Sequence, residues 1–133
     1  MPGVSPAKAS GHEGGLPPVR LRRVLDHIEA HLGDDIAMDR LAEVARLSPD
    51  HFSRLFRQSM GLPPHRYVLY RRIARARQLV ADSRLSLAEI GYALGFASQA
   101  HFTTMFRRLV GTTPGTYRGM TSHGDRRSPA IAI

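Results

Sequence analysis

Residues 47–61 read LSPDHFSRLFRQSMG, and residues 96–111 read FASQAHFTTMFRRLVG. Both stretches place a serine ahead of a His-Phe pair, continue to a Phe-Arg pair and end in glycine. In each stretch the apolar residues recur at the spacing of one helical face, and the polar and cationic residues fall on the opposite face. The residues of the apolar face are Phe52, Leu55, Phe56 and Ser59 in the first stretch, and Phe102, Met105, Phe106 and Leu109 in the second. Each stretch therefore predicts a helix with an apolar back and a polar front.

The residues ahead of the two stretches match as well. LAEVARL at 41–47 is parallel to IGYALGF at 90–96, so the copies are offset by 49 residues before the turn (41 to 90) and by 50 after it (52 to 102). A short amphipathic helix, a tight turn and a second helix with a polar face are typical of a helix-turn-helix, whose second helix enters the DNA major groove. The repeat is stronger evidence than one motif, because an aligned pair seldom arises by chance.

The composition suits a polyanionic partner. The chain has 133 residues, with 19 Lys and Arg against 11 Asp and Glu and a formal net charge of +8. Lys8 is the sole lysine, and the arginine excess fits either phosphate and guanine recognition or a GC-rich coding bias. The absence of cysteine excludes disulfides, thiolate metal sites and cysteine nucleophiles. No apolar run approaches the roughly 20 residues of a membrane span, so a cytoplasmic protein with no membrane partner is expected.

The chain is expected to be all-α, with two helix-turn-helix units joined by a long helix and about seven helices in total. Residues 1–18 are rich in Gly, Pro, Ser and Ala and are expected to be a flexible leader, residues 19–119 the folded domain, and residues 120–133 a disordered tail. The periodic segments predict helices at about 19–32, 38–45, 49–60, 65–82, 87–94 and 98–110, and a closing turn at 114–118.

Local chemistry supports these boundaries. Ser48, and Ser86 followed by Glu89, have the pattern of helix N-termini, whereas Ala37 is a weak cap. The long helix at 65–82 spans roughly 27 Å at 1.5 Å per residue, which compares with roughly 34 Å for one turn of B-DNA. It is therefore long enough to hold two reading helices near successive major grooves. The arginines expected to face mostly solvent along it are Arg71, Arg72, Arg75 and Arg77.

From about Leu21 to Arg118 the chain resembles the DNA-binding domain of AraC/XylS-type bacterial transcription regulators. The residues that carry the resemblance are LAEVARLSPDHFSRLFRQSMGLPPHRY (41–67), RRIARARQLVADSRLSLAEIGYALGF (71–96) and SQAHFTTMFRRLVGTTPGTYR (98–118). The resemblance implies an all-helical domain that binds double-stranded promoter DNA and acts on RNA polymerase recruitment. Two positions depart from the family pattern. Arg46 replaces a turn glycine, which implies a slightly altered turn, and Thr104 replaces a longer polar or basic residue.

The resemblance also implies which residues read base edges, because the family places them in the N-terminal half of each recognition helix. Carried over by position, the base-contacting candidates are Asp50, Ser53 and Arg54 in the first unit and Gln99, Ala100, Thr103 and Thr104 in the second. Residues better placed for DNA phosphates are Ser48, Arg57, Ser98, Arg107 and Arg108.

The chemistry of these side chains suggests what each would read. Arg54 can fork onto guanine O6 and N7, and its alternatives are a phosphate contact or a solvated arginine. Asp50 either accepts from cytosine N4 or only complements the helix dipole. Gln99 suits adenine, and Ala100 with the neighbouring threonine methyls suits thymine. The second half-site is therefore expected to favour A·T pairs, unless this helix reads little.

Histidines invite other interpretations. His51 and His101 each directly precede a core phenylalanine and are expected to pack or bond locally. His27 and His31 are spaced i, i+4 but have no third ligand, so no metal site is expected. No phosphate loop or Ser/His/Asp arrangement appears, and a DNA-repair alkyl acceptor would need a cysteine, so neither an enzyme nor a cofactor is expected.

Two questions stay open at this point. A nonspecific architectural DNA-binding protein would use the same charge, but a sequence-specific regulator prefers its site by roughly 10³ or more. Many AraC/XylS-type regulators also carry a separate effector-binding or dimerising domain. The chain is therefore either a monomer on DNA, with both reading helices in one molecule, or the DNA-binding part of a larger regulator.

Overall fold

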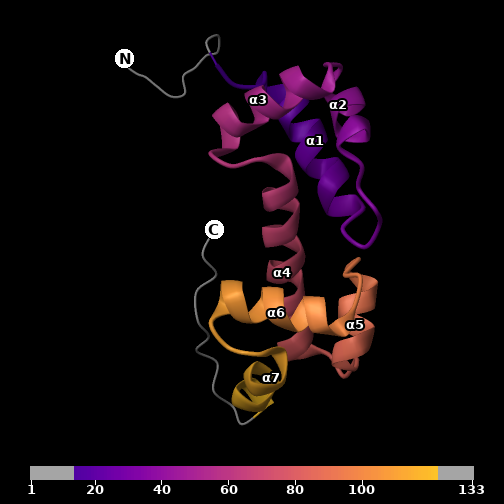
Figure 1. Cartoon of the computed structure of the whole chain (residues 1–133), viewed down its shortest axis with the longest axis vertical. Helices are drawn as coiled ribbons and strands as arrows, with labels where there is room; N and C mark the ends of the chain where they lie inside the picture. Colours follow the sequence, from indigo (N-terminus) through magenta and orange to yellow (C-terminus); the bar gives the residue numbers. More distant parts are fainter. Residues whose placement is uncertain (1–13, 123–133) are drawn as a thin grey trace. The chain divides into compact units, whose positions relative to one another are not determined.

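The computed structural model describes residues 14–122, and its regular elements there are helices without any strand (Figure 1). The seven helices are α1 (Pro18–Ala30), α2 (Met38–Ala45), α3 (Pro49–Met60), α4 (Pro64–Asp82), α5 (Leu87–Ala93), α6 (Gln99–Val110) and α7 (Pro114–Ser122). The expectation of an all-α chain with about seven helices is confirmed. Within residues 14–122, no helix is both long enough and apolar enough to cross a membrane.

The chain divides into two compact units. In the described residues, unit 1 comprises 14–31 and 36–68, and unit 2 comprises 32–35 and 69–122. Unit 1 holds α1, α2, α3 and the start of α4, and unit 2 holds the rest of α4 with α5, α6 and α7. Each unit therefore contains one of the two predicted helix-turn-helix pairs, α2–α3 or α5–α6.

The expected leader and tail are only partly described, since residues 1–13 and 123–133 lie outside the described residues. The remaining part of the leader is packed against unit 1. Leu16 is buried, and its backbone N–H donates to Ser59 Oγ at 2.7 Å. A single leucine among glycines and prolines carries no periodic signal, which is why its burial was not expected. At the other end, α7 continues to Ser122, past the expected closing turn at 114–118.

The core of unit 1 forms where α3 packs against the other helices of the unit. Phe52 and Phe56 of α3 are fully buried, together with Val24, Ile28 and Leu41. The ring of Phe56 meets Tyr67 edge-on at a centroid distance of 5.7 Å. Aromatic pairs at this distance and angle are favoured beyond the area that they bury. The phenylalanine pair thus fixes which face of α3 points inward.

Unit 2 repeats this arrangement. Phe102 and Phe106 of α6 are fully buried, and Phe106 meets Tyr117 edge-on, again at 5.7 Å. The α4 residues that complete this core are Ile73, Ala76 and Val80, all of them buried. Tyr117 therefore corresponds to Tyr67, because each packs on the second phenylalanine of its own recognition helix.

The turns of the two helix-turn-helix pairs are closed in the same way, although one has arginine where the other has glycine. Arg46 adopts the left-handed conformation, with φ 61° and ψ 44°, and Gly95 has φ 85°. The N–H to carbonyl bonds are Arg46 to Glu43 (2.9 Å) and Leu47 to Ala42 (3.0 Å) in unit 1, and Gly95 to Tyr92 (3.1 Å) and Phe96 to Gly91 (3.0 Å) in unit 2. The slightly altered turn expected at Arg46 is therefore not found, and arginine takes the conformation that favours glycine.

Arg72 does not face solvent as the helical pattern suggested. It is half-buried in unit 2, where its Nε donates to the Leu32 carbonyl at 2.8 Å and its Nη2 to the Asp34 carbonyl at 2.6 Å. Burial lowers the pKa of the Arg72 guanidinium, and the nearby carboxylates of Asp35 and Asp34 oppose that effect. Arginine is suited to this position because its fork of donors can satisfy two backbone carbonyls at once.

Replacing Arg46 by glycine should stabilise the protein. The left-handed conformation costs a non-glycine residue roughly 1–2 kcal/mol, and glycine loses about 0.5–1 kcal/mol more backbone entropy on folding. We therefore expect Arg46→Gly to raise the free energy of unfolding by about 0.5–1 kcal/mol, measured as a higher urea midpoint.

The matched control is Gly95→Ala, which should lower the urea midpoint. Its φ of 85° strains any side chain, and a Cβ there would lie 3.2 Å from the Arg72 guanidinium. A loss of stability in Arg46→Gly, or a gain in Gly95→Ala, would contradict this account of the two turns.

Candidate nucleic-acid interface

Each recognition helix has a well-defined start. Ser48 and Ser98 are the N-cap residues of α3 and α6, and their hydroxyl oxygens accept from the backbone N–H of His51 at 3.3 Å and of His101 at 3.0 Å. Such caps satisfy one of the N–H groups that a helix leaves unpaired at its N-terminus. The other N–H groups of a helix's first turn have no partner within the helix, which is why helix N-termini can bind anions.

The ends of both helices are equally well defined. Gly61 and Gly111 close α3 and α6 in the left-handed conformation, with φ of 82° and 101°. Their N–H groups donate to the carbonyls of Arg57 and Arg107 at 2.8 and 2.9 Å. Each helix is therefore bounded by a serine cap and a glycine stop, and its rotation is set by the buried phenylalanines.

The side chains predicted to read bases lie opposite the buried face. Of that set, Thr103 is half-buried and the others are exposed: Asp50, Ser53, Arg54, Gln99, Ala100 and Thr104. The residues predicted to contact phosphate are all exposed: Ser48, Arg57, Ser98, Arg107 and Arg108. The candidates of unit 1 thus lie together on the outer face of α3, and those of unit 2 lie together on the outer face of α6.

The two outer faces differ in chemistry. The front of α3 carries an acidic residue in its first turn, Asp50, and then Arg54 and Arg57. The front of α6 is uncharged in its N-terminal half and cationic only in its last turn, at Arg107 and Arg108. A rigid guanidinium and short polar side chains favour different base edges, so the two faces would read different sequences.

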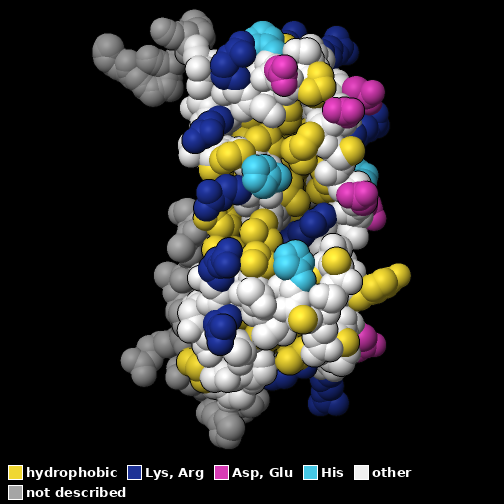
Figure 2. Space-filling view, in the orientation of Figure 1, with side chains coloured by type: hydrophobic (Ala, Val, Ile, Leu, Met, Phe, Trp, Pro, Cys, Tyr) yellow, Lys and Arg dark blue, Asp and Glu magenta, His cyan; other side chains and the backbone are white. Residues whose placement is uncertain are grey.

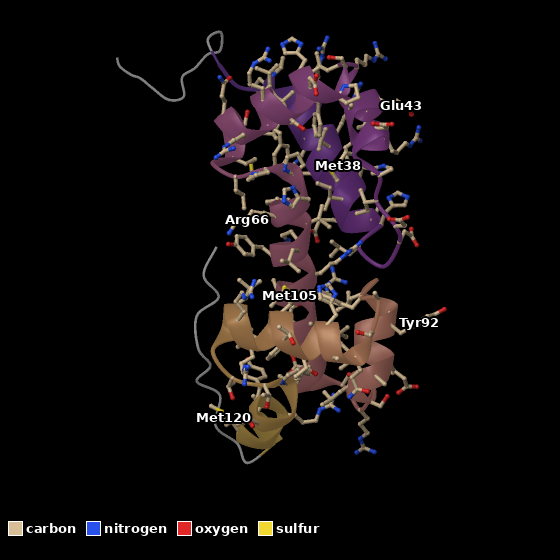
Figure 3. The ribbon with its side chains drawn as sticks, viewed as in Figure 1. Met38, Glu43, Arg66, Tyr92, Met105 and Met120 are labelled. Atoms are coloured by element: carbon tan, nitrogen blue, oxygen red, sulfur yellow. The ribbon has the colours of Figure 1, made fainter. Side chains whose placement is uncertain are left out.

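Two exposed residues were not included in the predicted site. Arg66 is an exposed cation in the first turn of α4 within unit 1, and its side chain points away from the helix (Figure 3). Tyr92 projects from α5 into solvent (Figure 3). Neither belongs to an apolar stripe or a recognition helix, and sequence periodicity alone carries no signal for them.

Three of the histidines make local side-chain contacts, at His27, His31 and His101. The ring of His101 meets Phe96 edge-on at 5.6 Å. The rings of His27 and His31 stack with centroids 4.1 Å apart, and His31 Nδ1 lies 2.8 Å from the His27 carbonyl oxygen. Among residues 14–122, no group of three or more His, Cys, Asp or Glu side chains is placed to hold a metal ion.

Comparisons with known proteins agree with this geometry. A family profile described as a helix-turn-helix domain matches residues 41–120. The chain is 41% identical over 101 residues to the probable transcriptional regulator LumQ of Photobacterium leiognathi, a match that covers 74% of this chain and 41% of that protein. The chain spans less than half the length of the curated relatives that it matches.

Solved structures extend the agreement to the fold. The crystal structure of an AraC-type transcriptional regulator from Chromobacterium violaceum superposes with a TM-score of 0.74 at 31% identity and covers 79% of this chain and 94% of that one. The DNA-binding domain of the global transcriptional factor AdpA, in complex with a target DNA, gives a TM-score of 0.75 at 28% identity and covers 81% of this chain and 98% of that one.

Two helix-turn-helix pairs, each with a buried aromatic face and a polar outer face, define a class of DNA-binding domain that has two recognition helices. The chain belongs to the AraC/XylS-type family of helix-turn-helix DNA-binding domains.

Unit 1 should lose stability at mildly acidic pH because of His27. Burial, and then the nearby His31 and Arg40, lower the pKa of His27 from its ordinary value of 6.5. Between that lowered pKa and 6.5 the unfolded chain binds more protons than the folded chain, so stability falls as the pH falls through this window. Urea midpoints measured from pH 7.5 to 5 should decline in the native protein and decline less in His27→Gln. An equal decline in both proteins would contradict the assignment to His27.

Proposed function

We propose that this chain is a sequence-specific regulator of transcription that binds double-stranded promoter DNA through α3 and α6. The observation that carries the proposal is the shared construction of these helices. In each, two fully buried phenylalanines hold the back, and the predicted contact residues lie on the opposite face. A helix held in this way can enter a major groove with its base-reading side chains already oriented.

In unit 1 we assign base reading to Arg54, with Ser53 and Asp50 beside it. Arg54 is exposed one turn into α3, where the N-terminal half of a recognition helix lies closest to base edges. Its guanidinium would donate to guanine O6 and N7, and Ser53 can bond to either a donor or an acceptor. Asp50 would accept from cytosine N4 or complement the α3 dipole.

In unit 2 we assign base reading to Gln99, Ala100, Thr103 and Thr104. The Gln99 amide can pair with adenine, and the three small side chains offer methyl groups to thymine. These residues carry no charge and have short reach, so the second half-site would favour A·T pairs. A G·C-rich second half-site in DNA selected by this protein would refute that assignment.

Phosphate contacts would provide most of the affinity. Arg57, Arg107 and Arg108 are exposed in the C-terminal parts of the recognition helices, and the Ser48 and Ser98 caps lie at their N-termini. Cations that neutralise phosphates release counterions, so binding should weaken steeply with salt. These contacts position the helices without reading sequence.

The two helices would occupy successive major grooves on an asymmetric site. They are connected in sequence through α4, whose 19 residues span about 28 Å at 1.5 Å per residue, compared with roughly 34 Å for one turn of B-DNA. One chain could therefore bind as a monomer, in the bacterial cytoplasm, and act on RNA polymerase. A dimerising domain elsewhere in a larger regulator would instead pair two such sites.

Arg54→Ala tests direct base reading. Binding to the preferred duplex should weaken by about 1–3 kcal/mol, and the preference at one G·C pair should disappear. Fluorescence anisotropy titrations against the preferred duplex and its single-pair variants provide the measurement.

The matched control is Arg57→Ala, on the same helix one turn later. This substitution should weaken binding to all duplexes by the same factor and reduce the slope of log K against log salt by about 1. If Arg54→Ala also weakens binding to every duplex by the same factor, Arg54 contacts only phosphate and the base assignment in unit 1 is wrong.

A further inference from the structure

The short segment that leads into α1 lies against the recognition helix of unit 1 (Figure 1). Leu16 is only 6% exposed, and its backbone N–H donates to Ser59 Oγ in the last turn of α3 at 2.7 Å. A Cβ on Gly15 would collide with that same hydroxyl oxygen and would lie 3.4 Å from the Ser59 Cα. Residues 14–16, the strap, therefore approach α3 closely, and glycine at position 15 permits that approach.

The strap contacts the part of α3 that the core of unit 1 holds least. The buried residues of α3 are Phe52 and Phe56, and no later residue of this helix is buried. In α6 a third residue, Val110 at the end of the helix, is buried as well. Its counterpart in α3, Met60, is only half-buried. The end of α6 is thus anchored within its own repeat, whereas the end of α3 lacks that anchor and is contacted by the strap.

Ser59 itself fits this contact. It is a polar residue on a face of α3 whose other members are apolar, and the equivalent residue of α6 is Leu109. The repeated helix-turn-helix therefore needs no hydroxyl at this position. The Ser59 hydroxyl instead accepts from the partly buried N–H of Leu16, and such a donor is costly to leave without a partner. The strap, and not the helix-turn-helix, accounts for this serine.

The strap also reaches the side of α3. Gly14 has a φ of 99°, and a Cβ there would lie 3.6 Å from Gln58 Oε1. Gln58 is exposed, whereas Ser59 is half-buried on the inward face, so the strap passes from the back of the helix toward its exposed side. Any chain on the N-terminal side of residue 14 is therefore attached beside the recognition helix.

The turn that the strap contacts carries part of the surface assigned to DNA. Arg57 is exposed two residues before Ser59, and Arg54 is exposed about one turn earlier. On the face of unit 1 that Figure 2 displays, Lys and Arg side chains appear at the edge that the end of α3 occupies in Figure 1. The position of these cations therefore depends on a contact made by residues that lie outside 41–120, the range that matches the helix-turn-helix profile.

We propose that the strap is a positioning element for DNA binding by unit 1. Leu16 holds the end of α3 as Val110 holds the end of α6, and its release selectively weakens binding to the half-site that α3 reads. Release of the strap would therefore lower specific binding while the contacts of unit 2 remain. The effect on DNA rests on the proposed function, whereas the hold of the strap on α3 is tested without DNA.

The first test measures hydrogen exchange of the backbone amides in the full chain without DNA. Leu16→Ala should speed the exchange of Gln58, Ser59 and Met60 by about tenfold or more, because a turn that loses buried contacts opens more often. The amides in the last turn of α6 should keep their native rates. Val19→Ala is the matched control, since Val19 is close in sequence but 64% exposed, and it should change neither helix.

The second test measures which half-site the strap affects, with the duplex selected by the native protein. Leu16→Ala should weaken binding to this duplex about three- to tenfold, because affinity scales with the fraction of chains in the competent conformation. Scrambling the element read by α3 should then cost less affinity than in the native protein, and scrambling the element read by α6 should cost the same. Val110→Ala should give the reverse pattern.

Two further variants keep the test decisive. Leu16→Met conserves the buried volume and should retain native exchange rates and native DNA affinity. If Leu16→Ala does not fold, Gly15→Ala replaces it, because its Cβ displaces the strap from the Ser59 hydroxyl. That variant should give the same pattern with a smaller size.

Three results would overturn the proposal. The first is a native exchange rate in the last turn of α3 once the strap is altered. The second is an equal rise of exchange in α3 and α6, which would indicate a general loss of stability. The third is an equal loss of affinity at both elements of the duplex. A native protein that selects no preferred duplex would contradict the proposed function instead, and the exchange rates alone would then decide whether the strap holds α3.

Discussion

The structure depends on an edge-to-face contact that occurs once in each unit. Phe56 meets Tyr67, and Phe106 meets Tyr117, at the same centroid distance of 5.7 Å. Each contact joins a recognition helix to the helix that follows it, across a glycine stop and a proline. With the first phenylalanine of each pair also fully buried, the recognition helix has little freedom to rotate. The orientation of its outer face is thus a consequence of core packing, and the residues on that face can vary without changing the fold.

Because the core sets the orientation of the recognition helices and leaves their outer faces free to vary, the two units share a backbone arrangement yet differ in surface chemistry. The serine caps, the glycine stops and the hydrogen bonds of the turns are equivalent in both. The hydrogen bonds that close the turn hold Arg46 in the left-handed region, although this conformation costs a non-glycine residue about 1–2 kcal/mol. On the outer faces no such constraint acts, so α3 carries Arg54 where α6 carries Thr104. A protein of this construction can read two unlike half-sites with one repeated scaffold.

Much of this could be predicted from the sequence, because helical periodicity, serine caps and an internal repeat are all local signals. The range expected for α2 was the one observed, and the capping box at Ser86 and Glu89 was confirmed. Long-range contacts could not be predicted. Leu16 is buried, and Arg72 donates to carbonyls about 40 residues earlier in the chain. No hydrophobic periodicity in the sequence indicates either contact. The pocket lined by Gly33, Arg72 and Tyr92 likewise arises from segments that meet only in the folded chain, so no sequence motif marks it.

Selection from a random duplex DNA pool tests the central claim most directly. The winning duplex and a scrambled duplex are then titrated with the protein across a salt series. If α3 and α6, oriented by their buried phenylalanines, each read one major groove, the selected site should contain two short, unlike elements about one helical turn apart. The preference over scrambled DNA should be roughly 10³ or more. If no motif emerges and both duplexes bind with the same steep salt dependence, charge alone drives binding, and the chain is a nonspecific architectural DNA binder.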